Sequence, residues 1–285
     1  MAVASPSPVL ITGCSTGIGR ATAEHLARRG HEVYATARKL EALAGLEASG
    51  CHLLALDVTD EDSMTAAVDE VLAREGTIGA LVNNAGYSQS GAIETVDLDA
   101  VRRQFETNVF GLIRMSQLVL PSMRGAGRGR IVNISSMGAN FTFPGGGVYH
   151  ATKYAVEAIS DALRFEVKGF GVDVVIIQPG AIRTEFDKAA TASLDAHSSD
   201  GGPYDEFNAK VGRITARAYE KGPLKLLGGG PETVAKAIET ALTAPRPKLR
   251  YRVTPSARVL IGQRRLIGAR GWDAFLAQQF PRPRS

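Results

Sequence analysis

Short apolar runs alternate with amphipathic stretches along the first two thirds of the chain. This alternation is typical of βαβ units, in which helices cover a parallel sheet. The run Val172–Ile177 is almost entirely β-branched, as expected of a parallel strand buried on both faces. We therefore predict an α/β fold, a single domain with a doubly wound parallel sheet. The predicted strands are Val9–Thr12, Glu32–Ala37, His52–Leu56, Ala80–Asn83, Arg130–Ile134 and Val172–Gln178, and the predicted helices are Gly19–Arg29, Asp62–Ala73, Ala100–Met123 and Tyr149–Phe170.

The pattern changes after Gly180, where glycine and proline clusters at 201–203 and 228–231 indicate loops. Between them an apolar stripe recurs at helical spacing, at Phe207, Val211, Ile214 and Ala218. We interpret residues of about 185–230 as a lid over an apolar pocket. A helix packed permanently on the body is the alternative. A last helix is predicted to start at Pro231, since proline suits the first helical turn.

The composition of the chain limits the class of protein and the compartment to be expected. The chain has 285 residues, of which 44% are apolar and 22% charged, which is typical of a globular protein. Two cysteines suit a reducing compartment, and no stretch is apolar for long enough to span a membrane or resemble a secretory signal, so we expect a cytoplasmic protein. The histidines show no metal-ligand spacing, and no metal site is predicted.

The net charge of +4 is unevenly distributed. Residues 245–285 contain ten Lys or Arg against Asp273 alone, a local charge of +9, which leaves −5 on residues 1–244. We treat 245–285 as a basic C-terminal extension, most simply a solvated face, with an acidic partner or weak contact with a membrane surface as alternatives. Its apolar residues suit an interfacial helix or packing against the body or a second subunit, and its glycines weaken a continuous helix. The apolar residues are Val259, Leu260, Leu266, Ile267, Trp272, Phe275 and Leu276, and the glycines Gly262, Gly268 and Gly271.

A glycine-rich loop, Thr12–Gly19, follows the first predicted strand and opens a helix. Glycines let the backbone approach a pyrophosphate, while the helix N-terminus offers free N–H groups and a positive dipole. The spacing G-x-x-x-G-x-G differs from the commonest dinucleotide fingerprint, and an ordinary strand-to-helix turn is the alternative. Its position directly after an apolar strand favours dinucleotide binding.

Tyr149 and Lys153 are four residues apart in a helical stretch, which places them on one face. A phenol ordinarily ionises at roughly pH 10, and a nearby ammonium favours the phenolate, giving an acid/base suited to a carbonyl oxygen. Ser136, just past a predicted strand, could hold the substrate oxygen, with Ser135 as the competing candidate. His150 lies about 100° round the helix from Tyr149, so we expect a structural role for it.

Taken together, these motifs resemble the short-chain dehydrogenase/reductase family in its shorter branch, with 17β-hydroxysteroid and retinol dehydrogenase-like members the most similar in style. The match covers T-G-x-x-x-G-x-G at Thr12–Gly19, N-N-A-G at 83–86, Asn108, Ser136, Y-x-x-x-K at Tyr149 and Lys153, and P-G at 179–180. The resemblance extends from about Val9 to Thr184 and implies a Rossmann-like fold, hydride transfer between a nicotinamide cofactor and an alcohol or carbonyl, and a homo-oligomer. It assigns residues 1–244 to one dinucleotide-binding and catalytic domain.

The resemblance also implies residue roles. Those on the cofactor phosphates and ribose are Gly13, Ser15, Gly17, Ile18 and Gly19. Those near the adenine and its ribose are Asp57, Val58, Asn84, Ala85 and Gly86. Those that position the nicotinamide are Pro179, Gly180, Ile182 and Thr184. Tyr149 is the acid/base and Lys153 binds the nicotinamide ribose, while Asn108 kinks its helix and holds a proton-relaying water.

The second predicted strand ends in Ala37 followed by Arg38. In dinucleotide folds an acid at this position bonds the ribose 2′-hydroxyl and repels a 2′-phosphate. The acid is missing here and a guanidinium is available, so we predict NADP(H), with Lys39 and the Ser15 hydroxyl as further phosphate contacts. The alternative is an NAD-preferring enzyme in which Arg38 only meets solvent.

The substrate is expected to be a largely apolar small molecule, steroid-, retinoid- or lipid-like. The residues behind this expectation are Met137, Phe141, Phe143, Pro144, Phe186 and the lid stripe. Two alternative functions are a sugar-nucleotide epimerase of the family's longer branch and a dinucleotide-sensing protein without turnover. The glycine spacing argues against the first, and the full catalytic set argues against the second. Nothing indicates a nucleic-acid partner.

Overall fold

The computed structural model describes residues 8–184, 202–220, 226–280 and 282–283, and for 215–220 the backbone alone. Its strands are β1 (Val9–Ile11), β2 (Val33–Ala37), β3 (Cys51–Ala55), β4 (Ala80–Asn83), β5 (Gly129–Ile134), β6 (Val172–Pro179) and β7 (Arg250–Val253). Its α-helices are α1 (Gly17–Arg28), α2 (Glu61–Glu75), α3 (Leu98–Phe105), α4 (Gly111–Gly125), α5 (Gly147–Val167), α7 (Asp205–Glu220), α9 (Pro231–Thr243) and α10 (Pro255–Gln279). Short 3-10 turns lie at Leu40–Leu43, Glu47–Ser49, Met137–Ala139 and Lys168–Phe170, and a π-helical turn at Glu106–Phe110.

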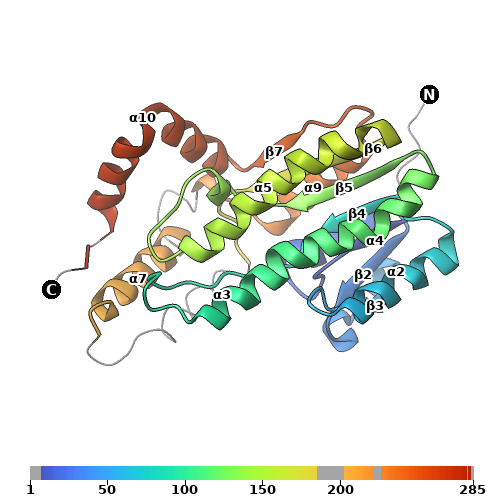
Figure 1. Cartoon of the computed structure of the whole chain (residues 1–285), viewed down its shortest axis with the longest axis horizontal. Coiled ribbons are helices and arrows are strands. Elements are labelled where there is room, and N and C mark those ends of the chain that lie inside the picture. Colours follow the sequence, from blue (N-terminus) through green and yellow to red (C-terminus); the bar gives the residue numbers. More distant parts are fainter. Residues whose placement is uncertain (1–7, 185–201, 221–225, 281, 284–285) are drawn as a thin grey trace.

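The seven strands form one parallel sheet in the order β3-β2-β1-β4-β5-β6-β7. Helices α1 and α9 pack on one face, and α2, α4 and α5 cover the other (Figure 1). Successive strand residues alternate between the two cores: Val9 and Ile11 face α1 and α9, whereas Leu10 faces α2 and α4. All three are fully buried, which accounts for the continuous apolar runs in the sequence. The predicted Rossmann-like α/β fold is confirmed.

The strand order reverses direction at β1 and β4. In such sheets a ligand binds in the crevice outside the carboxyl ends of the strands at this switch point. The glycine loop follows β1, the segment with Asn84 follows β4, and Ser136 follows β5. The topology therefore brings to one edge of the sheet three motifs that are distant in the sequence.

The structure differs from the predicted elements in several places. The single helix expected at Ala100–Met123 is interrupted by the π-helical turn Glu106–Phe110, which contains Asn108. The strand β7, Arg250–Val253, was not predicted, and it lies within the basic extension. It pairs with β6 at the sheet edge, where Arg250 bonds Glu157 (2.9 Å). The predicted strands, and the helices predicted at Gly19–Arg29, Asp62–Ala73 and Tyr149–Phe170, match the structure to within two or three residues at each end. A helix begins at Pro231 as predicted, but it is not the last one, because α10 follows it.

The C-terminal helix α10 runs from Pro255 to Gln279 and is interrupted at Gly268, whose φ of 66° and ψ of −170° are not helical. Of the three glycines expected to weaken a helix here, this one breaks it. Beyond the break Trp272 is buried and donates from Nε1 to the Thr142 carbonyl (3.1 Å). Its ring packs on Phe141, so this part of the extension contacts the body of the protein, one of the predicted alternatives. None of the described helices is long and apolar enough to cross a membrane.

Candidate active site

The glycine loop after β1 is fastened to the segment after β4. The Thr12 hydroxyl accepts hydrogen bonds from the backbone N–H groups of Asn84 and Ala85 (3.0 Å each). The Asn84 amide donates to the Thr12 and Gly13 carbonyls (2.9 Å each). Gly13 has φ +75°, and a Cβ there would lie 2.8 Å from the Ala85 Cα. Only glycine therefore allows the two segments to approach this closely.

Gly17 and Gly19 continue this loop into α1. Gly17 also has a positive φ (+58°) and lies beside Thr184. Gly19 is buried, and a Cβ there would lie 2.2 Å from the Gly13 carbonyl oxygen. The free N–H groups at the start of α1 thus lie at a loop in which Gly13, Gly17 and Gly19 have no side chain, which fits a dinucleotide pyrophosphate.

Asn108 lies in the π-helical turn behind Gly86. Its Oδ1 accepts from the Tyr87 N–H (3.0 Å), and its Nδ2 donates to the Tyr87 carbonyl (2.9 Å) and the Thr152 hydroxyl (3.1 Å). A Cβ on Gly86 would lie 3.0 Å from Asn108 Oδ1 and 3.8 Å from Lys153 Nζ. The π-helical turn thus brings the Asn108 amide close to the ammonium of Lys153.

Helix α5 presents Tyr149 and Lys153 to the same cavity. Lys153 is buried, donates from Nζ to the Ile134 carbonyl (2.8 Å), and lies 5.8 Å from the centre of the Tyr149 ring. Burial lowers the pKa of Lys153 to about 8, which leaves the group mostly protonated at neutral pH. A positive charge therefore lies beside the phenol, where it stabilises negative charge on the phenol oxygen.

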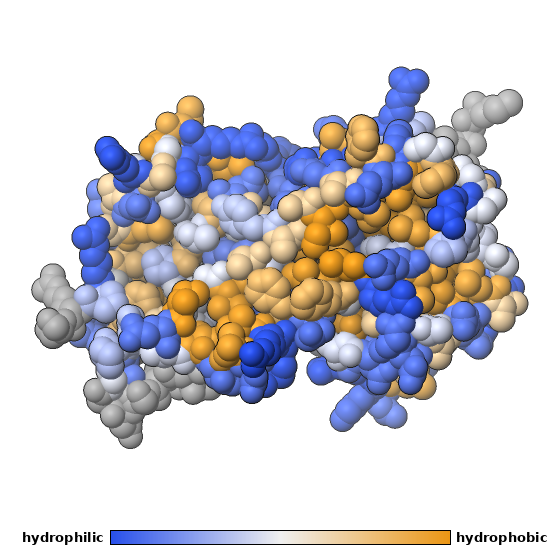
Figure 2. Space-filling view, viewed as in Figure 1, coloured by the Kyte–Doolittle hydropathy of each residue, from blue (hydrophilic) through white to orange (hydrophobic). Residues whose placement is uncertain are grey.

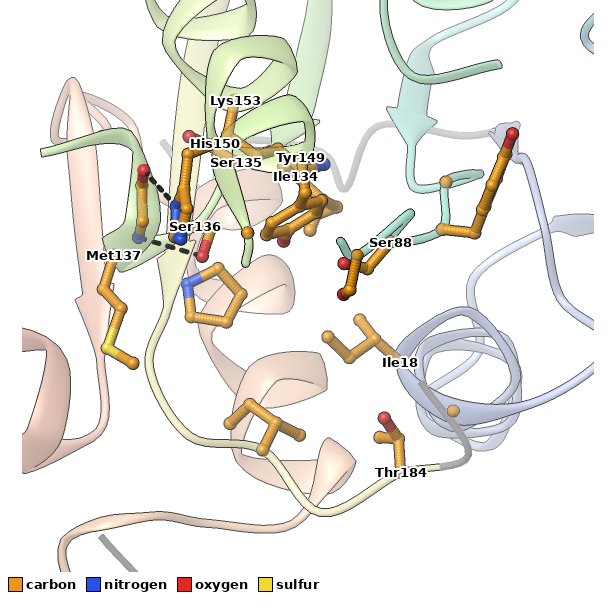
Figure 3. Close-up of a pocket in the computed structure, with 18 of the residues that line it drawn as sticks. Ile18, Ser88, Ile134, Ser135, Ser136, Met137, Tyr149, His150, Lys153 and Thr184 are labelled. Carbon is orange, nitrogen blue, oxygen red and sulfur yellow. Dashed lines mark hydrogen bonds between the residues drawn. The ribbon is translucent and has the colours of Figure 1, made fainter. Parts of the chain in front are cut away.

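Ser136 and Ser135 differ in their surroundings. The Ser136 Oγ accepts from the Gly138 N–H (3.0 Å), so its own proton is available to an acceptor in the cavity. Ser135 is 2% exposed, and its Oγ has no hydrogen-bond partner among the described residues. Figure 3 shows Ser136 and Tyr149 bordering one space. The geometry favours Ser136 as the group that holds a substrate oxygen.

A single cavity of about 930 Å³ joins these groups. Every residue assigned to the cofactor lines it except Gly19: Gly13, Ser15, Gly17, Ile18, Arg38, Asp57, Val58, Asn84, Ala85, Gly86, Tyr149, Lys153, Pro179, Gly180, Ile182 and Thr184. Ser136 lines it too, whereas Asn108 lies behind the wall. The residues between the glycine loop and Tyr149 fit a dinucleotide.

The chain is similar in sequence and in fold to known proteins. A family model described as short chain dehydrogenase matches residues 7–195. The 3-ketodihydrosphingosine reductase of Bacteroides thetaiotaomicron is 35% identical over 259 residues, which cover 90% of this chain and 91% of that protein. Estradiol 17-beta-dehydrogenase 1 of Rattus norvegicus is 36% identical over 269 residues, which cover 88% and 76%. The crystal structure of a short-chain dehydrogenase from Streptomyces avermitilis matches with a TM-score of 0.74 and 34% identity over 95% of each chain.

The chain belongs to the short-chain dehydrogenase family. It is therefore an oxidoreductase that acts on alcohol or carbonyl groups. The predicted resemblance to 17β-hydroxysteroid dehydrogenases is confirmed by the match to the rat enzyme.

The pocket residues predicted for this dehydrogenase are only partly in its cavity. Met137, Phe143 and Pro144 line it, as do Val211 and Ile214 of the predicted lid stripe. Phe141 does not line it, because its ring is buried against Trp272. Phe207 borders a smaller neighbouring cavity of about 390 Å³ instead. Phe186, the Ala218 side chain and the lid segments 185–201 and 221–225 lie outside the described residues.

The dehydrogenase cavity has a wall that the sequence analysis did not predict. Helix α10 and the residue after it contribute Val259, Leu260, Phe275, Gln279 and Phe280. The apolar residues of the extension were recognised in the sequence, but their periodicity did not show which surface they cover. Beyond the break at Gly268, the second half of α10 packs against the body, and the ring centre of its Trp272 lies 6.0 Å from that of Phe143.

His150, on α5, bonds the segment 135–146 that connects β5 to α5 and contains Ser136, which we call the Ser136 loop. Its Nδ1 bonds the Gly138 carbonyl (2.8 Å), one of the dashed lines in Figure 3, and its Nε2 accepts from the Phe143 N–H (3.2 Å). This pattern requires the neutral ring. A Cβ on Gly138 would lie 2.3 Å from His150 Nδ1, so the ring fits because that residue is glycine. The predicted structural role of His150 agrees with these contacts.

Burial lowers the pKa of His150 to about 4, from 6.5 in the unfolded chain. Between these values the unfolded state binds the proton and the folded state does not, so stability is lost as the pH falls through this window. We expect His150 to cost the dehydrogenase about 2 kcal/mol of unfolding free energy between pH 7 and pH 5. Urea titrations at both pH values measure this loss.

The variant His150→Gln should be less stable at pH 7 and show a smaller loss between pH 7 and pH 5. An equal acid loss in wild type and His150→Gln would show that His150 does not bind the proton on unfolding.

Proposed function

We propose that this dehydrogenase uses NADP(H) to interconvert a ketone or aldehyde and the corresponding alcohol on a largely apolar substrate. One observation carries the proposal. A single cavity runs from the glycine loop and Arg38, past Tyr149 and Ser136, to an apolar end. A dinucleotide and a substrate carbonyl can therefore meet at the phenol within one enclosure.

The chain's own residues supply binding and proton transfer. A bound nicotinamide supplies or accepts the hydride. The Ser136 hydroxyl donates to the substrate oxygen and orients it toward Tyr149. Tyr149 gives its proton to that oxygen during reduction and removes a proton during oxidation. The Lys153 ammonium, held by the Ile134 carbonyl, stabilises the phenolate that remains.

The phosphate end of the cavity supports NADP(H). Ala37 ends β2 with no carboxylate, and Arg38 follows it, exposed and lining the cavity. Arg38 makes no hydrogen bond or ion pair with any described residue, so its guanidinium is available to a 2′-phosphate. Lys39 is exposed but does not line the cavity, which leaves Arg38 as the main phosphate contact.

The opposite end supports an apolar substrate. Met137 and Phe143 from the Ser136 loop, Val211 from α7, and Leu260 and Phe275 from α10 converge there. A polar substrate would lose its hydration at these side chains without gaining hydrogen bonds, whereas an apolar one gains free energy in proportion to the area buried.

A screen of carbonyl compounds graded by size and polarity tests this function, with NADPH consumption as the readout. We expect kcat/KM to rise at least about tenfold from a small polar ketone to a bulky apolar one, because a few buried methylene groups suffice for that factor. Heat-inactivated protein is the control for background oxidation. No NADPH consumption across the panel, or a preference for the polar members, would contradict the proposal.

A further inference from the structure

Helix α10 carries an apolar surface that nothing in the described structure covers. Before its break, Val259 is 51% exposed, Leu266 87% and Ile267 39%. Val259 and Leu266 are seven residues apart, which places them on one face of a regular helix. The opposite side of the same segment, including Ala257 and Ile261, is fully buried against the Ser136 loop. The helix is thus amphipathic, with its second apolar arc directed outward.

Basic side chains flank this exposed arc. Arg258 and Arg265, each one residue before an exposed apolar residue, are also seven apart and exposed. Neither makes an ion pair or hydrogen bond with a described residue, so both charges are free to meet an external anion. Figure 2 shows apolar side chains protruding among hydrophilic ones over α10, at the upper left. We call Arg258, Val259, Arg265, Leu266 and Ile267 the α10 lip.

We propose that the α10 lip docks this protein on the surface of an anionic lipid bilayer. Projecting aliphatic side chains bounded by arginines match the two layers that a bilayer surface presents, phosphate-rich headgroups and the acyl region beneath them. An exposed Leu266 would gain nothing from a nucleic acid, and the unpaired arginines would repel one another across a contact between two identical lips. The +9 charge of 245–285 adds long-range attraction to anionic lipid.

The lip also adjoins the cavity. Val259 is half exposed and at the same time lines the cavity wall, next to Leu260. Docking through the lip would therefore place the apolar end of the cavity at the lipid surface. The docking itself does not rest on the proposed function, because it requires neither cofactor nor substrate.

Sedimentation with vesicles tests the proposal on the full-length protein. Phosphatidylcholine vesicles containing about 30 mol % phosphatidylglycerol should bind the wild type, and more weakly as salt is raised. Pure phosphatidylcholine vesicles should bind it less. The variants Leu266→Glu and Arg265→Glu should each lower the partition coefficient at least about tenfold, since one removes apolar insertion and the other reverses a contact charge.

Phe165→Glu provides the matched control, because Phe165 on α5 is 89% exposed and lies outside the lip. It should bind vesicles like the wild type. Thermal unfolding of all three variants checks that the fold is kept, and sedimentation velocity without lipid reports the oligomeric state. Absence of wild-type binding, or equal losses in Leu266→Glu and Phe165→Glu, would overturn the proposal. A change of oligomeric state in Leu266→Glu with unaltered vesicle binding would instead assign the lip to a contact between copies.

Discussion

Replacing Tyr149 by Phe is expected to lower kcat at least roughly 10²-fold while leaving the Kd for NADPH nearly unchanged. The substitution removes only the phenol oxygen, so the ring still fills its place between Lys153 and the cavity. The cofactor contacts proposed at the glycine loop, Arg38 and Lys153 are untouched. Steady-state turnover with the best substrate of the carbonyl screen gives kcat, and NADPH fluorescence titration gives Kd.

The two serines after β5 provide a matched pair for this experiment. Ser136→Ala removes the hydroxyl proposed to hold the substrate oxygen and should also reduce kcat/KM substantially. Ser135→Ala, at a buried hydroxyl that bonds none of the described residues, should retain activity. Near-normal kcat in Tyr149→Phe would remove Tyr149 from the acid/base role, and the reverse result for the serines would reassign the substrate contact to Ser135.

Many residues of the proposed site could be identified from the sequence because they follow the ends of strands, whereas Tyr149 and Lys153 lie on helix α5. Gly13, Asn84 and Ser136 come directly after three apolar runs, and the carboxyl ends of parallel strands meet at one edge of the sheet. A local sequence pattern is enough to locate such residues. A run of apolar residues indicates the strand, and a glycine after it indicates that the backbone passes close to another segment or to a ligand. The likeness to a known family added roles that geometry alone would not assign.

Other features depend on long-range packing and leave little trace in a local pattern. The π-helical turn at Asn108 lies between α3 and α4, and apolar residues recur at helical spacing on both sides of it, so the sequence pattern does not reveal the interruption. Strand β7 has a charged sequence because it is an edge strand, where Arg250 is satisfied by Glu157 and Asp161 of α5. The cavity wall formed by α10 depends on the direction in which the chain turns at Gly268. The spacing of apolar residues does not predict that direction.

The preference for NADPH over NADH is expected to reverse in Ala37→Asp. A carboxylate at the end of β2 would repel the 2′-phosphate of NADPH and accept a hydrogen bond from the 2′-hydroxyl of NADH. Ala37 lines the cavity, so the new side chain can reach its ligand. The substitution should weaken the binding of NADPH and strengthen the binding of NADH. The ratio of the two kcat/KM values should therefore shift by at least about 10²-fold.

Arg38→Ala tests the other half of the same argument. Removing the guanidinium should lower kcat/KM for NADPH roughly tenfold or more, the scale of a charge-assisted hydrogen bond, and change the value for NADH little. Lys39→Ala is the matched control, since Lys39 is also exposed and is adjacent to Arg38 but does not line the cavity. The cofactor preference of this variant should stay that of the wild type. A wild type that uses NADH better would refute NADP(H) as the cofactor. An unchanged ratio in Arg38→Ala would show that the missing acid at Ala37, and not the arginine, sets the choice.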